Sequence, residues 1–136
     1  MGNFTVPVEV FSEDGSRSAV LDAVVDTGAT YTCLPENLLR DLGIVPVRRV
    51  ESELADGSVS QDDLGVARVK VDGIEVITYV SFSRESAPVL LGAIAMETAL
   101  LVVDPVRKRL VPTRALKYVF SNRAPDCLLS PYQQTI

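Results

Sequence analysis

Apolar and polar residues alternate along most of this chain, and that alternation indicates strands with one face in a core. The first alternating stretch is 5–11, and a turn at 13–16 separates it from the second, 19–25. Glycine, proline and Asp-Gly pairs bound the extended segments that follow, as expected for hairpins. These further strands are predicted at 30–34, 47–54, 59–71, 74–82, 88–92, 100–103 and 109–111.

Two short segments have helical rather than alternating character. The first, 35–42, begins with Pro35 and is followed by Gly43, which is the usual arrangement at the two ends of a helix. The second is predicted at 93–99. The pattern as a whole favours a mostly β domain with two short helices, folded as a closed or nearly closed barrel.

Composition and charge narrow the classes of function. The chain has 136 residues, 47% of them hydrophobic, which fits one domain with a substantial core. Its net charge is −5 and its basic runs are short, so we expect no nucleic-acid partner. No apolar run approaches the roughly 18 residues of a membrane helix, and the N-terminus lacks the features of a signal peptide. We therefore expect a cytoplasmic protein without a membrane partner.

The chain contains no histidine and two cysteines, Cys33 and Cys127. The lack of histidine excludes a Ser-His-Asp triad, a Cys-His pair and a zinc site as such sites are normally built. Cys33 is expected to be a small packing residue rather than a nucleophile. Any catalysis must depend on carboxylates, hydroxyls, amines or backbone groups, and we expect neither a metal nor a cofactor.

The strongest candidate for chemistry is the Asp-Thr-Gly-Ala sequence at 26–29, directly after the apolar strand 19–25. Two carboxylates held about 3 Å apart cannot both ionise, so they share a proton. The ionised carboxylate can take a proton from water while the protonated one hydrogen-bonds the carbonyl under attack. A single Asp-Thr-Gly also fits an ordinary turn at a strand end. A second feature is needed to decide between a catalytic aspartate and an ordinary turn.

That second feature is Val89-Leu90-Leu91-Gly92, followed by the predicted helix 93–99. The two motifs together resemble the retropepsin-like aspartic proteases of the cellular and bacterial type, over roughly residues 5–112. The resemblance implies an acid-protease barrel with Asp26, Thr27 and Gly28 as catalytic residues. Thr27 would bond across a two-fold axis, Ala29 would meet the substrate backbone, and residues 90–92 would brace the catalytic loop.

The same resemblance places a substrate-covering flap between the two motifs, at the predicted hairpin 54–59. Its substrate-binding residues would be Ala55, Asp56, Gly57 and Ser58. An ordinary solvent-exposed hairpin explains the same residues, and only their position between the motifs favours a flap.

The motif occurs once, whereas a pepsin-like chain would contain it twice. Dimerisation about a two-fold axis supplies a second carboxylate, so a homodimer is expected. Viral members pair an aspartate after the first motif with an arginine after the second; here those positions are Thr30 and Ala93. The dimer must therefore rest on other contacts. Residues 1–112 are expected to form the protease domain, and 113–136 an extension without an assigned role.

The leading hypothesis is a homodimeric aspartic endopeptidase that cuts extended peptides between apolar side chains. A first alternative is a retropepsin-like dimerisation or peptide-binding module with little or no proteolytic activity, since fold alone does not establish function. A second is an unrelated small barrel with a coincidental motif. An intact Asp-Thr-Gly favours the enzyme, because burying a carboxylate without a use is costly.

Overall fold

The structure is a computed structural model that describes residues 3–117. All of the predicted strands and helices are present, and the first and fifth strands have the predicted bounds. The elements are β1 (Thr5–Phe11), β2 (Ser18–Val25), β3 (Thr32–Pro35), α1 (Glu36–Asp41), β4 (Arg48–Glu53), β5 (Val59–Val71), β6 (Ile74–Ser83), β7 (Leu90–Leu91), α2 (Ala93–Thr98), β8 (Leu101–Asp104) and β9 (Arg109–Pro112). Within the described residues, no helix is long and apolar enough to cross a membrane.

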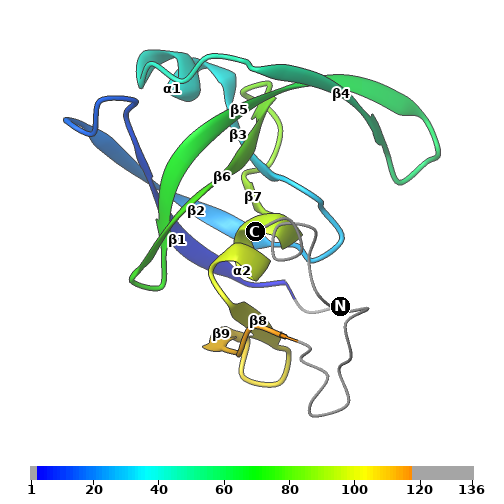
Figure 1. The fold of residues 1–136 in the computed structure, drawn as a ribbon. Coiled ribbons are helices and arrows are strands. Elements are labelled where there is room, and N and C mark those ends of the chain that lie inside the picture. Colours follow the sequence, from blue (N-terminus) through cyan, green and yellow to red (C-terminus); the bar gives the residue numbers. More distant parts are fainter. Residues whose placement is uncertain (1–2, 118–136) are drawn as a thin grey trace, which may run out of the picture.

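The main sheet curves back on itself (Figure 1). Its strand order is β1-β2-β7-β3-β6-β5-β4, and β1 also pairs with β5, so six of the strands are hydrogen-bonded in a ring. This pairing is consistent with the expected barrel. β4 lies outside the ring as the first strand of a long hairpin with β5, and β8 and β9 form a separate two-stranded sheet.

Alternate residues of the strands fill the core, which is why the apolar pattern identified them. Val8 and Val10 of β1 and Val69 of β5 have no solvent exposure. Leu34 and Leu91, from β3 and β7, are equally buried. Removing such a side chain from water stabilises the fold by roughly 1.5–3 kcal/mol. The short strands β3 and β7 are therefore stabilised by side-chain packing as much as by backbone pairing.

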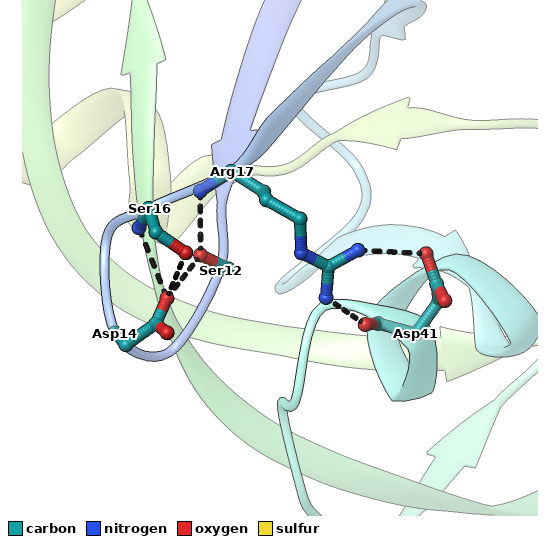
Figure 2. A network of polar contacts seen from close by, with 5 residues as sticks. All are labelled: Ser12, Asp14, Ser16, Arg17 and Asp41. Atoms are coloured by element: carbon teal, nitrogen blue, oxygen red, sulfur yellow. Dashed lines mark hydrogen bonds and ion pairs between the residues drawn. The ribbon is translucent and has the colours of Figure 1, made fainter.

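The turn between β1 and β2 is held by a network of polar contacts (Figure 2). Asp14 Oδ1 accepts hydrogen bonds from the backbone N–H of Ser16 (2.9 Å), from Ser16 Oγ (2.7 Å) and from Ser12 Oγ (2.8 Å). These bonds, that from the Ser16 backbone most of all, lower the pKa of Asp14 to about 2. Arg17 pairs with Asp41 at 3.3 Å and so links this turn to the end of α1.

This network makes stability depend on pH in the acid range. Because the pKa of Asp14 is depressed on folding, its contribution is present above about pH 4 and is lost as the pH falls through about 2. We expect Asp14→Ala to lower the urea midpoint of unfolding at pH 6 and to have little effect near pH 2. Circular dichroism at a series of pH values measures this difference. A midpoint difference that is equally large near pH 2 would contradict the expectation.

Candidate active site

The parallel pairing of β2 with β7 brings the two sequence motifs together. Val24 and Val25 stand beside Leu90 and Leu91 in the register of these strands. Beyond the paired residues, the backbone N–H of Asp26 donates to the carbonyl of Leu91 at 3.0 Å. Pairing with β7 therefore fixes the position of the Asp26 backbone at the end of β2. This contact is what the expected bracing role of residues 90–92 requires.

The loop after β2 folds back on the Asp26 side chain. Asp26 Oδ1 accepts the backbone N–H of Gly28 at 2.9 Å, and the Asp26 carbonyl accepts the N–H of Ala29 at 3.2 Å. A Cβ at position 28 would lie 3.2 Å from that same Oδ1. Glycine therefore leaves the carboxylate room for its hydrogen bond. Asp26 is half-buried, while Thr27 and Gly28 are exposed beside it.

The start of α2 supports the loop from behind. The N–H groups of Ala93 and Ile94 donate to the carbonyls of Ala29 (2.7 Å) and Thr30 (3.1 Å). Thr30 and Ala93 are the positions at which this chain lacks the ion pair of viral members. In this subunit their backbones hold the loop against the helix.

Thr32 is a site residue that sequence reasoning missed. It is fully buried, and its Oγ1 accepts the N–H of Gly92 at 3.0 Å across 60 positions of sequence. In the sequence it is one more β-branched residue in a strand. Only the pairing of β3 with β7 shows that its hydroxyl satisfies a buried N–H at the start of α2.

Asp26 and Thr27 open onto a pocket of about 600 Å³. Among the described residues, Asp26 is the one carboxylate that lines it. The walls are otherwise mostly apolar, and the lining consists of Asn3, Phe4, Val24, Val25, Asp26, Thr27, Pro88, Leu90, Val103 and Pro105. No group of three or more potential metal ligands occurs within residues 3–117. One subunit thus offers one carboxylate and one hydroxyl on an apolar surface.

The predicted flap residues lie apart from this pocket in the single subunit. Residues 55–58 form the exposed tip of the β4–β5 hairpin, and none of them lines the Asp26 pocket. Asp56 Oδ1 accepts the N–H of Ser58 at 2.9 Å and its Oγ at 2.6 Å, and these bonds lower the pKa of Asp56. Gly57 has φ +86°, which explains a glycine at this turn. A role for the tip in substrate binding stays a prediction.

Cys33 stands next to Leu90 in the register of β3 and β7 and is half-buried. Burial raises the pKa of its thiol, and the charges of Asp62 and Asp26 add to the increase. A raised pKa keeps the thiol protonated, which fits the expected packing role better than a nucleophile. Cys127 lies outside the described residues.

Comparison with known families decides between the interpretations of the Asp-Thr-Gly motif. The profile of the family described as "gag-polyprotein putative aspartyl protease" matches residues 17–98, more than half of the chain and including both motifs. The chain belongs to this family of retropepsin-like aspartyl proteases. A coincidental motif on an unrelated barrel is thereby excluded.

Solved structures agree with this assignment. The solution structure of the simian foamy virus (mac) protease is 26% identical, with a TM-score of 0.50 over 69% of this chain and 92% of that one. The foamy viral protease-reverse transcriptase, solved in complex with an RNA/DNA hybrid, is 18% identical with a TM-score of 0.51. That match covers 88% of this chain but 14% of the viral one, and it shows the fold alone. No curated protein sequence matches the chain significantly.

Proposed function

We propose that this retropepsin-like protein is a homodimeric aspartic endopeptidase, in which Asp26 of each subunit supplies one carboxylate of the catalytic pair. The observation that carries the proposal is the single carboxylate in the Asp26 pocket, held at the end of a central strand. Aspartic peptide hydrolysis needs two carboxylates that share a proton. A second copy of the same loop, related by a two-fold axis, supplies the missing one.

In the proposed reaction, the ionised Asp26 removes a proton from water, and the oxygen of that water attacks the peptide carbonyl. The protonated Asp26 of the partner hydrogen-bonds the carbonyl oxygen as negative charge develops there. The C–N bond then breaks and the leaving amine takes a proton from the pair. The N–H of Gly28 orients one carboxylate oxygen throughout.

In this proposal the remaining predicted site residues contact the partner subunit or the substrate. Thr27 is exposed at the edge of the loop, where a hydroxyl is available to the partner's loop. Ala29 is anchored through its carbonyl to α2, which fixes the floor beside the substrate. Residues 55–58 are exposed at the hairpin tip, so their backbone groups are accessible to an extended peptide.

Dilution tests whether the active species is a dimer. We expect casein cleavage between pH 3 and 8, with activity per mole of protein falling as the dimer dissociates on dilution. Analytical ultracentrifugation at the same concentrations gives the dimer fraction, and the two curves should coincide. Constant specific activity in a demonstrated monomer would contradict the shared site. A stable dimer that cuts nothing would favour the binding module without proteolytic activity.

A further inference from the structure

A row of residues connects the Asp26 pocket with the β4–β5 hairpin. The strand registers place Val24 beside Leu90, Leu90 beside Cys33, Cys33 beside Ser81 and Ser81 beside Leu64. Residues that are partners in a sheet lie on the same face. Because Val24 and Leu90 line the pocket, this face of the barrel carries the pocket at one end and β5 at the other.

Asp62 extends this face toward the hairpin. It lies two positions before Leu64 on β5, and residues two apart on a strand share a face. In the hairpin it stands opposite Val50, and Ser60 stands opposite Ser52. All four of these residues are half-buried, whereas the residues between them on both strands (Glu51 and Gln61) are exposed. The Asp62 side is thus the more covered side of the hairpin, which projects from the barrel in Figure 1.

Charge links Asp62 with the catalytic region. After burial, which is the larger cause, both Asp62 and Asp26 raise the pKa of the Cys33 thiol by their charge. Cys33 therefore lies within electrostatic range of both carboxylates. Along the row of strand partners, Asp62 and the pocket therefore lie on either side of Cys33.

Asp62 also has no cationic partner in the part of the chain that the structure describes. Its one side-chain hydrogen bond there is a long one, 3.4 Å from Ser60 Oγ. The next residue, Asp63, pairs with Arg49 at 3.3 Å on the opposite side of the hairpin. Arg48 lies diagonal to Asp62 across the strands but makes no ion pair with it within 4 Å. A half-covered carboxylate in this position gains from a cation brought by a ligand.

We propose that Asp62 is a specificity residue that selects a lysine or arginine side chain of the substrate, close to the cleaved bond but not beside it. This inference rests on the proposed protease function. The proposed preference modifies the expectation that only apolar side chains determine specificity. Apolar substrate residues would flank the cleaved bond, next to Val24 and Leu90. A basic substrate residue would lie farther along the peptide. In a symmetric dimer the partner's Asp62 provides the same preference on the other side of the bond.

Matched peptides test this preference. Each peptide carries the same apolar pair at its centre and lysine, glutamine or glutamate at one of the next three positions on either side. We expect the wild type to cleave the best lysine peptide with kcat/KM about tenfold above its glutamine match. Asp62→Asn should remove that ratio, and Asp62→Lys should favour glutamate. Asp63→Asn is the matched control and should leave the ratio unchanged.

The outcomes separate this inference from the function on which it rests. Cleavage of lysine and glutamine peptides at equal rates by the wild type would overturn the role of Asp62 and leave the protease assignment intact. A lysine preference that persists in both Asp62 variants would do the same. Cleavage of none of the peptides by the wild-type dimer would overturn the proposed function and this inference with it.

Discussion

Asp26→Asn is expected to abolish peptide cleavage while leaving the fold in place. An asparagine side chain cannot accept a proton from water or share one with the partner's carboxylate, so kcat should fall at least about a thousandfold. The fold should persist because the asparagine oxygen can still accept the N–H of Gly28. The change in stability is expected to stay within about 1 kcal/mol.

Casein cleavage by wild type and variant, with thermal unfolding of both, measures this difference. Asp72→Asn provides the matched control. Asp72 is an exposed residue of the β5–β6 turn with φ +53°, a conformation that asparagine tolerates, and full activity is expected. Residual cleavage by Asp26→Asn at a tenth of the wild-type rate would show that another group does the chemistry.

Gly92→Ala is expected to give the largest loss of stability among the substitutions considered for this fold. A Cβ at position 92 would collide with the carbonyl group of Tyr31 and would lie 2.8 Å from the backbone nitrogen of Thr32. Both obstacles are backbone atoms of the segment that leads into β3, so neither can move aside by a rotamer change. We expect a cost of about 3 kcal/mol or more, measured by urea unfolding.

Gly73→Ala separates this steric effect from a general loss of glycine. Gly73 has φ +80°, but no atom lies within 4 Å of the position that a Cβ would take, so the cost there is conformational alone. That cost should be about 1–2 kcal/mol. If Gly92→Ala were no more destabilising than Gly73→Ala, the close approach of residue 92 to the backbone of Tyr31 and Thr32 would be wrong.

Much of the fold could be predicted because its strands are regular and bounded by turns with clear signals. β5 keeps its predicted bounds because its apolar alternation is long and Asp72-Gly73 ends it. β7 is shorter than expected, with two residues in place of five. Its length depends on where β2 and β3 pair with it, and these partners are distant in sequence. The extension predicted at 113–136 lies largely outside the described residues and stays a prediction.

The candidate site could be predicted only as far as local motifs reach. Asp26 and Gly92 were found because each lies in a short motif. Thr32 was missed because its bond to Gly92 depends on a strand pairing that no local pattern shows. Asp62 and Asp63 are adjacent and alike in sequence. Which of them shares the face of the pocket depends on the register of β5 with β6.

The most direct test of the shared catalytic pair mixes two kinds of subunit. Wild type and a ninefold excess of Asp26→Asn are unfolded and refolded together, at a concentration at which the dimer is fully formed. If a working site needs Asp26 from both subunits, random pairing should reduce the activity of a fixed amount of wild type to about one tenth. Activity equal to or above that of wild type refolded alone would contradict the account, because a single Asp26 would then be sufficient.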